Sequence, residues 1–253
     1  MQVFAMLKQE RHAFIIQQLN VHNRVYSTDL QLRLDVSEDT IRRDLQELAE
    51  EGMLIKVHGG AVSKSFHFTL SNNNVYASKA KQDIARKACH LIANDMVVLL
   101  TGGTTIREMV NELSPMLKAT FITPSIPIAL ELMNHPRVDV IFIGNQLNKN
   151  AQMATGAEVM KMLSTIRADL CFLGTNAIEA SVGITESSWE VVEVKKAMIQ
   201  ATDKLVSMVI AEKLNTIQPM QVCGISEIDT LITELAPDNE LLAPYRNKGL
   251  TLL

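Results

Sequence analysis

The chain of 253 residues contains only three cysteines, few aromatic residues and no long apolar segment. Cys89, Cys171 and Cys223 are far apart in apolar surroundings and lack metal-ligand spacing, so we expect buried free thiols in a reducing compartment. No apolar run approaches the roughly 20 residues that a membrane helix needs. Residues 1–20 lack the continuous apolar core of a signal peptide. The sequence therefore predicts a cytoplasmic protein without a membrane partner, a metal or a cofactor.

The chain also lacks the excess of positive charge that is typical of many nucleic-acid-binding proteins. It has 24 lysines and arginines against 28 aspartates and glutamates, a formal net charge of −4. Residues 1–60 are no exception, with seven basic and nine acidic side chains. Any case for DNA binding must therefore rest on where the cations lie. With 47% apolar residues, the chain is long enough for two domains with ordinary aliphatic cores.

Residues 7–52 show the pattern of three short helices. Apolar residues at helical spacing predict an amphipathic helix over residues 7–20. Ser27 or Thr28 can cap a second helix, which would bury two leucines four residues apart. Ser37 is placed to cap a third helix, which is expected to end near Gly52.

The third helix has one apolar face and one polar face. At 100° per residue, its apolar sector contains Ile41, Leu45 and Leu48, whereas Arg43 lies opposite and Arg42 lies on the flank. The neighbours of Arg43 are short or polar: Asp39, Thr40, Gln46 and Glu47. A buried side with donors on the other side is what a DNA recognition helix requires. The alternative is an ordinary solvated surface helix.

Residues 53–62 favour the first interpretation. They predict a β-hairpin with a Gly-Gly turn at Gly59 and Gly60, which would form a wing and place Lys56 and His58 beside the DNA groove. This segment follows a compact three-helix pattern with a tight turn before the third helix.

The motifs of residues 7–62 resemble those of the DeoR family of bacterial winged helix-turn-helix regulators. The resemblance rests on Glu10-Arg11-His12, on Val36 to Leu45 with its Thr-Ile-Arg-Arg-Asp-Leu run, and on His58-Gly59-Gly60-Ala61. It implies a first domain over residues 1–62 and a start near Met6, so that residues 1–5 would be an extension. The residues implied in DNA binding are Ser37, Glu38, Asp39, Thr40, Arg42, Arg43, Gln46, Lys56, His58 and Gly59.

The remainder of the chain alternates helical and apolar strand segments. Residues 63–78 read as a linker, because they contain turn formers and few aliphatic residues. Residues 79–253 predict a doubly wound α/β domain with a parallel sheet. Its expected strands are 96–100, 120–123, 138–143, 170–173, 206–210 and 230–233, and its expected helices begin with 79–93 and continue at 127–134, 158–166 and 190–201.

The loop Thr101-Gly102-Gly103-Thr104-Thr105 follows the first of these strands and precedes a helix. Ligands of such sheets bind at the carboxyl ends of the strands, and free N–H groups at a helix N-terminus bind anions. The loop therefore predicts a phosphate site. The alternative is that its glycines serve only the geometry of the turn.

The family resemblance gives this domain a role. It implies a ribose-5-phosphate isomerase-like effector domain that binds a phosphorylated sugar. The implied effector residues are Thr101, Gly102, Gly103, Thr104, Thr105, Ser125, Gly156, Lys195 and Lys213. Lys195 would pair with the ligand or with a carboxylate; the alternative is an exposed helix lysine. The chain departs from the family pattern at Thr101, Gly102, Pro124, Asn145, Ala177 and Ile210, so the phosphate part of the site looks retained and the sugar part changed.

These observations predict a DNA-binding transcriptional regulator, most often a repressor in this family, of carbohydrate metabolism genes. A phosphorylated sugar would modulate it, and a homo-oligomer, dimer or tetramer, would bind double-stranded operator DNA. One alternative is an isomerase-like enzyme with an accessory DNA-binding head. Thr101 and Ile210 replace acids of the family, although Glu186 and Glu190 remain, so no catalytic residue is predicted. The other alternative is a constitutive DNA binder whose second domain only oligomerises.

Overall fold

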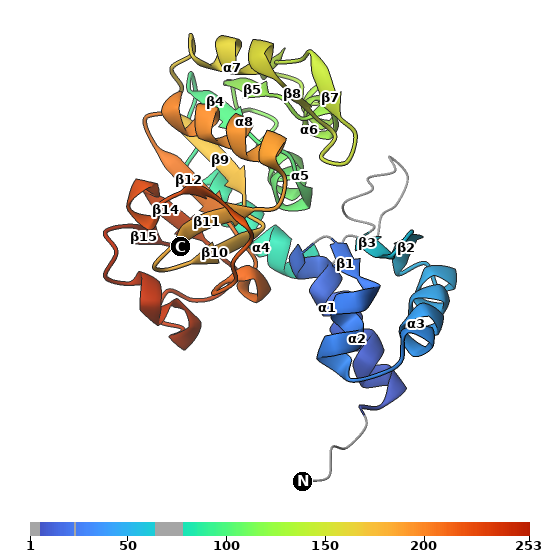
Figure 1. Cartoon of the computed structure of the whole chain (residues 1–253). Coiled ribbons are helices and arrows are strands. Elements are labelled where there is room, and N and C mark those ends of the chain that lie inside the picture. Colours follow the sequence, from blue (N-terminus) through green and yellow to red (C-terminus); the bar gives the residue numbers. More distant parts are fainter. Residues whose placement is uncertain (1–5, 23, 64–77) are drawn as a thin grey trace. The chain divides into compact units, whose positions relative to one another are not determined.

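The computed structural model describes residues 6–22, 24–63 and 78–253 (Figure 1). The chain divides into two compact units, residues 1–76 and 77–253, and each is described by itself. The predicted linker at 63–78 lies outside the described residues except at its two ends, and so does the predicted extension at 1–5. Among the described residues, no helix is both long enough and apolar enough to cross a membrane.

The first unit contains three helices and a small antiparallel sheet. Its elements are α1 (Lys8–His22), β1 (Arg24–Tyr26), α2 (Ser27–Leu34), α3 (Glu38–Glu50), β2 (Leu54–Val57) and β3 (Gly60–Ser63). The strand order is β1-β3-β2, so the predicted hairpin of β2 and β3 gains a third strand that the sequence analysis did not predict. Apolar side chains from all three helices form one core, which includes Ile15, Leu30 and Leu45.

The helix caps are partly as expected. Ser37 caps α3, because its side chain accepts a hydrogen bond from the N–H of Thr40, and the acidic first turn suits the helix dipole. The predicted cap of α2 is wrong: its N-cap residue is Tyr26, which makes no side-chain cap. The N–H of Ser27 donates instead to the carbonyl oxygen of Gly59 at 2.9 Å. A backbone group of the wing thus does what a cap side chain would do.

The second unit is built on a seven-stranded parallel sheet. The strand order is β15-β14-β12-β9-β4-β5-β6, and every neighbouring pair is parallel. Its strands are β4 (Val97–Leu100), β5 (Thr120–Thr123), β6 (Asp139–Phe142), β9 (Leu170–Gly174), β12 (Leu205–Met208), β14 (Thr230–Ile232) and β15 (Thr251–Leu252). Its helices are α4 (Ser78–Cys89), α5 (Thr104–Asn111), α6 (Ile126–Leu132), α7 (Ala157–Leu163) and α8 (Trp189–Gln200).

Both faces of the sheet are buried, as expected of a doubly wound fold. Leu99 and Cys171 share a core with residues of α7 and α8. The intervening residues Leu100 and Phe172 point to the opposite face and are fully buried as well. The predicted fold class is confirmed. The helix expected over 79–93 ends earlier, at Cys89.

Short antiparallel elements extend this framework and were not predicted. They are the hairpin of β7 (Gln146–Asn148) and β8 (Met153–Thr155), and the sheet of β10 (Ala177–Glu179), β11 (Gly183–Glu186) and β13 (Met220–Cys223). These strands mix apolar with polar or small residues over three or four positions, which is too few to show a period of two. The predicted parallel strands are no longer, but most of them belong to apolar runs. The antiparallel elements matter here because β11 ends at Glu186, close to the carboxyl edge of the main sheet.

Candidate nucleic-acid interface and effector site

Helix α3 presents a polar face with two arginines. Arg42, Arg43 and Gln46 are exposed and Thr40 is half-buried. The apolar residues on its other side are buried in the core of the first unit. The predicted residues at its start, Ser37, Glu38 and Asp39, are exposed as well. The helix therefore has the buried anchor side and the accessible donors that reading of base edges requires.

The wing strand β2 lies against this helix. The Nζ of Lys56 donates to Oε1 of Gln46 at 3.0 Å and to the carbonyl oxygen of Arg42 at 3.4 Å. The wing cation is thus held beside the exposed face of α3. His58, in the turn that follows, is exposed. The structure brings Arg42, Gln46 and Lys56 into one surface.

The Gly-Gly turn of the wing requires both of its glycines, for different reasons. Gly59 has a φ of +75°, which is strained for other residues. A Cβ on Gly60 would lie 2.0 Å from the carbonyl oxygen of Val25, so only glycine allows β1 to approach β3. Gly59 therefore shapes the wing through its backbone.

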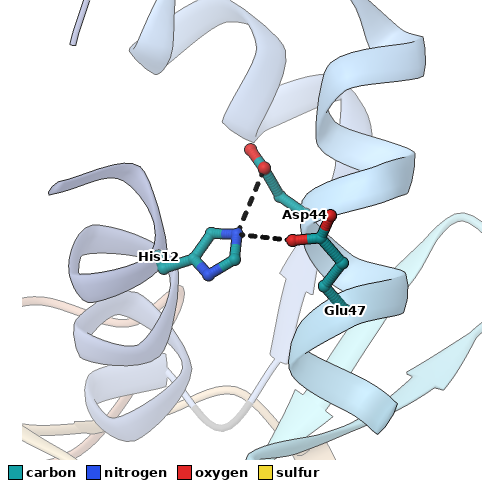
Figure 2. A group of neighbouring side chains, drawn as sticks. All are labelled: His12, Asp44 and Glu47. Atoms are coloured by element: carbon teal, nitrogen blue, oxygen red, sulfur yellow. Dashed lines mark hydrogen bonds and ion pairs between the residues drawn. The ribbon is translucent and has the colours of Figure 1, made fainter. Parts of the chain in front are cut away.

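A buried carboxylate on α3 was not predicted. Asp44 is 2% exposed and accepts two hydrogen bonds from Arg11, at 2.8 and 3.0 Å, and one from Nε2 of His12 at 3.2 Å. Figure 2 shows His12 of α1 facing both Asp44 and Glu47, which project from α3. Lys8 forms an ion pair with Glu47, and the hydrogen bond with Asp44 raises the pKa of Arg11.

His12, Asp44 and Glu47 lie close enough together to hold a metal ion, but both carboxylates already have cationic partners. Asp44 is bound by Arg11 and Glu47 by Lys8, so both carboxylates have cationic partners. The cluster instead connects α1 to the buried side of α3. The sequence signal for it lies in the family motifs, since Arg11, His12 and Asp44 all belong to the segments that carry the resemblance.

In the second unit, the predicted loop lies at the carboxyl ends of β4 and β9. Thr101 is buried, and its Oγ1 accepts a hydrogen bond from the N–H of Gly174 at 2.8 Å and donates to the carbonyl oxygen of Phe172 at 3.3 Å. These bonds hold two strand ends together. Thr101 thus occupies a structural position, and its hydroxyl already has partners.

The rest of the loop has the form of an anion site. Gly103, with a φ of +117°, is the N-cap of α5, and Thr104 and Thr105 form its first turn. The first N–H groups of a helix have no partner within it. Ser125 is buried, and its Oγ would lie 3.1 Å from a Cβ on Gly102, so the small residue there keeps this hydroxyl within reach of the loop.

Gly156 lies between the β7–β8 hairpin and α7, next to the loop that contains Ser125. It is the N-cap of α7 with a φ of +95°, and it directly follows β8. Met153 of β8 forms an antiparallel bridge with Ser125. The β7–β8 hairpin therefore adjoins the loop through Ser125, although Gly156 itself has a conformational role at the start of a short helix.

Lys195 belongs to a buried polar network. It is 4% exposed, so the alternative of an exposed helix lysine is wrong. Its Nζ binds Oε2 of Glu186 at 2.7 Å and the carbonyl oxygen of Gly174 at 3.1 Å. Asn176 donates to both oxygens of Glu186, at 3.0 and 2.8 Å. Burial acts to raise the pKa of Glu186, but Lys195, the N–H of Ser187 and Asn176 outweigh it and lower the pKa.

Two further lysines lie near this network. Lys213 is half-buried, and its Nζ donates to Oδ1 of Asn176 at 3.3 Å. Burial lowers its pKa to about 8, against the opposing effect of Glu186. Lys81 of α4 is 5% exposed, and burial together with the charge of Lys213 lowers its pKa to about 7. Lys81 was not predicted as a site residue.

The sequence did carry a signal for Lys81. The position falls on the apolar stripe of α4, three residues before Ile84 and seven before Ala88, both of which are fully buried. A lysine at such a position must have its charge matched or lose it. Lys81, Lys195 and Lys213 thus form a set of buried or half-buried cations, at the edge of the sheet where the loop begins.

Comparison with known proteins settles the family. A model of the DeoR C terminal sensor domain matches residues 76–235, and a model of the DeoR-like helix-turn-helix domain matches residues 11–66. The chain belongs to the DeoR family. As a member it is a DNA-binding transcriptional regulator, which confirms the expectation from its motifs.

Curated relatives match this DeoR-family regulator over almost its whole length. The HTH-type transcriptional regulator GolR of Listeria innocua is 31% identical over 95% of this chain and 96% of its own. The HTH-type transcriptional repressor GlcR of Bacillus subtilis is 30% identical over 98% and 96%. The glycerol-3-phosphate regulon repressor of Escherichia coli is 26% identical over 92% and 93%.

Solved structures resemble the DeoR-family regulator in fold. The tetrameric eIF2B-beta2-delta2 complex from C. thermophilum matches with a TM-score of 0.50 and 12% identity, over 98% of this chain and 90% of that chain. Ribose 5 phosphate isomerase A from Neisseria gonorrhoeae matches with a TM-score of 0.41 and 13% identity, over 54% of this chain and 53% of that chain.

Proposed function

We propose that this regulator is a repressor of carbohydrate metabolism genes, which binds operator DNA as a homo-oligomer and responds to a phosphorylated sugar. The observation that carries the proposal is the exposed face of α3, where Arg43 lies opposite the buried side of the helix. The names of the GlcR and glycerol-3-phosphate regulon repressors support the repressor role and the kind of target gene.

The DNA contacts divide by chemistry. Arg43, Thr40 and Arg42 can reach base edges from a helix in the major groove, because arginine presents the paired donors that guanine accepts. Lys56 and His58 lie on the wing and are suited to phosphate contacts, which position the protein without reading sequence. Two such modules in a homo-oligomer would read half-sites about one helical turn, or a multiple of it, apart.

The phosphate of the effector would lie at the start of α5. The free N–H groups of that helix and the hydroxyls of Thr104, Thr105 and Ser125 supply neutral donors. Lys81 and Lys213 supply charge from nearby, and an anion would favour the charged form of both. Lys195 would act indirectly, because it holds the carboxylate of Glu186, whose charge in turn acts on Lys213.

The same network argues for binding rather than catalysis. An isomerase needs a carboxylate that can take up a proton near neutral pH. Glu186 is the buried acid at this edge, but Lys195 and Asn176 bind its oxygens and lower its pKa. A carboxylate held in this way is suited to orienting cations or sugar hydroxyls. We therefore propose a sensor domain without enzyme activity.

A thermal-shift screen tests the effector half of the proposal. Phosphorylated sugars, their unphosphorylated parents and inorganic sulfate are compared on the full chain. A bound effector at 100 times its dissociation constant should stabilise the protein by about 2.7 kcal/mol, whereas the unphosphorylated parent should not. Thr104→Val should weaken the response by removing one donor. Thr251→Val, on the edge strand β15, is the matched control and should leave it unchanged.

A titration with operator DNA then links the two units. The effector found in the screen should change the operator dissociation constant by about 5-fold or more. Unchanged affinity with every stabilising ligand would favour the constitutive binder with a purely oligomerising second domain. Turnover of a phosphorylated sugar by the purified chain would favour the isomerase-like alternative.

A further inference from the structure

The basic side chains of the first unit differ in whether a carboxylate neutralises them. Lys8 and Arg11 form ion pairs with carboxylates of α3, and Arg33 donates to Oε1 of Gln18 at 2.7 Å. Among the residues that the structure describes, no carboxylate partner is seen for the other four, which are Arg24, Arg42, Arg43 and Lys56. Because residues 1–60 carry more acids than bases, such cations are what the unit can offer to DNA. Three of the four belong to the proposed DNA face, and Arg24 is the fourth.

Arg24 lies on the outer face of β1. Val25, which stands between Arg24 and Tyr26, is buried in the core of the first unit, and successive side chains of a strand point to opposite faces. Arg24 and Tyr26 therefore project together away from the core, and both are exposed. The guanidinium carbon of Arg24 lies 4.8 Å from the centroid of the Tyr26 ring, which makes a cation–π contact.

Strand β1 places this pair beside the wing turn. It pairs with β3 so that Tyr26 lies opposite Gly60, directly after the turn that contains His58 and Gly59 (Figure 1). The N–H of Ser27 donates to the carbonyl oxygen of Gly59 at 2.9 Å, which ties the end of β1 to the turn. Because Gly60 has no side chain, the Tyr26 ring has no cross-strand side chain beside it and is 48% exposed. The pair thus lies next to the wing residues that are suited to phosphate contacts.

The stack leaves the donors of Arg24 available. An arginine that stacks on an aromatic ring uses the flat face of its guanidinium, whereas its N–H groups lie in the plane. No described residue accepts a hydrogen bond from these groups. Their fork matches the oxygens of a phosphate in two parallel hydrogen bonds. The exposed carboxylate of Asp29, in the first turn of α2, disfavours an anion bound by the helix start alone, so a phosphate near the turn needs this cation.

We propose that Arg24, stacked on Tyr26, binds a phosphate of the DNA backbone beside the wing. The contact extends the DNA-binding surface from α3 and β2 to β1. It carries no sequence information, because it is directed at the backbone and not at base edges. The inference rests on the proposed function in one respect, the placement of the α3 face and the wing turn against DNA.

A salt titration of the full chain tests the contact. The wild type and Arg24→Gln are titrated by fluorescence anisotropy against a selected operator and against unrelated double-stranded DNA, between about 50 and 200 mM salt. The logarithm of the binding constant falls with the logarithm of the salt concentration, with a slope of about −0.9 for each phosphate neutralised. We expect Arg24→Gln to reduce the magnitude of this slope by about 0.9 for each Arg24 engaged, on both DNAs alike. The dissociation constant at about 0.1 M salt should rise about fivefold or more.

Three further variants separate charge, stacking and position. Arg24→Lys keeps the charge and should keep the slope. Tyr26→Leu removes the ring but not the charge, so the slope should persist while the dissociation constant rises about threefold on both DNAs. Arg33→Gln removes an exposed cation at the opposite end of α2 from the wing turn, and it should change neither quantity.

A slope that Arg24→Gln leaves unchanged would overturn the phosphate contact. The stack would then be a structural feature of β1 only, which thermal unfolding would register as a lower melting temperature of the variant. A loss of affinity confined to the operator, or an equal change of slope in Arg33→Gln, would overturn the contact as well. The proposed function fails differently. Operator affinity that Arg43→Ala leaves unchanged would count against it, while a reduced slope of Arg24→Gln on unrelated DNA would still support the contact.

Discussion

The guanidinium of Arg11 on α1 donates two hydrogen bonds, of 2.8 and 3.0 Å, to the carboxylate of Asp44 on α3. This pair connects the first helix of the unit to the buried side of the helix that carries Arg43. The pair therefore braces α3 against α1. Because Asp44 lies on the buried side of α3, its bonds with Arg11 help to fix the orientation of the exposed face.

Arg11→Met should therefore destabilise the first unit. The substitution leaves Asp44 buried with only His12 as a side-chain partner, and an uncompensated buried charge of this kind costs about 3 kcal/mol. Hydrogen exchange of the α3 amides in the full chain measures the loss. Lys8→Met, which removes the exposed ion pair with Glu47, is the control and should change little. Equal protection of both variants would contradict the bracing role of Arg11.

The wing turn gives a second prediction, which compares two neighbouring glycines. Gly60→Ala forces a Cβ to within 2.0 Å of a backbone oxygen and should cost about 3 kcal/mol or more. Gly59→Ala meets no atom within 4 Å but must adopt a φ of +75°, which costs about 1–2 kcal/mol. Exchange of the β2 and β3 amides distinguishes the two. A larger effect at Gly59 than at Gly60 would contradict the packing of β1 on β3.

The sequence predicted the parts of the molecule that depend on local pattern. The apolar sector of α3, the cap at Ser37 and the parallel strands all follow from periodicity or from one residue at a helix start. The burial of Asp44 was not predicted, because it depends on Arg11, a partner 33 residues away in the sequence. The family resemblance implied that Lys195 pairs with the ligand or a carboxylate, but local pattern could not identify Glu186 as its partner, because Glu186 lies on a different element.

The lysines of the second unit predict how stability depends on pH. Lys81 has a pKa of about 7 in the folded protein against 10.5 for its ordinary value. Between these values the unfolded chain binds more protons, so stability should rise as pH increases from about 7, by up to about 1.4 kcal/mol per pH unit for one group. Lys213, with a pKa of about 8, adds to the rise above pH 8.

Denaturant unfolding of the full chain between pH 6.5 and 9.5 checks this. Lys81→Met should flatten the curve, because it removes the group that must lose its proton on burial. Lys79→Met, on the exposed side of the same helix, should keep the wild-type slope. A wild-type stability that falls across this range, or a slope that Lys81→Met leaves unchanged, would contradict the assignment of Lys81 as a desolvated cation.

The central claim is that the exposed face of α3 reads DNA sequence, and Arg43→Ala tests it most directly. The variant is titrated by fluorescence anisotropy against an operator selected from random DNA with the wild-type chain, and against unrelated DNA. We expect operator binding to weaken by about 1–3 kcal/mol, with little change on unrelated DNA and no loss of folding. Arg86→Ala, an exposed arginine on α4, should have no effect. Operator affinity equal to that of the wild-type chain would contradict the account.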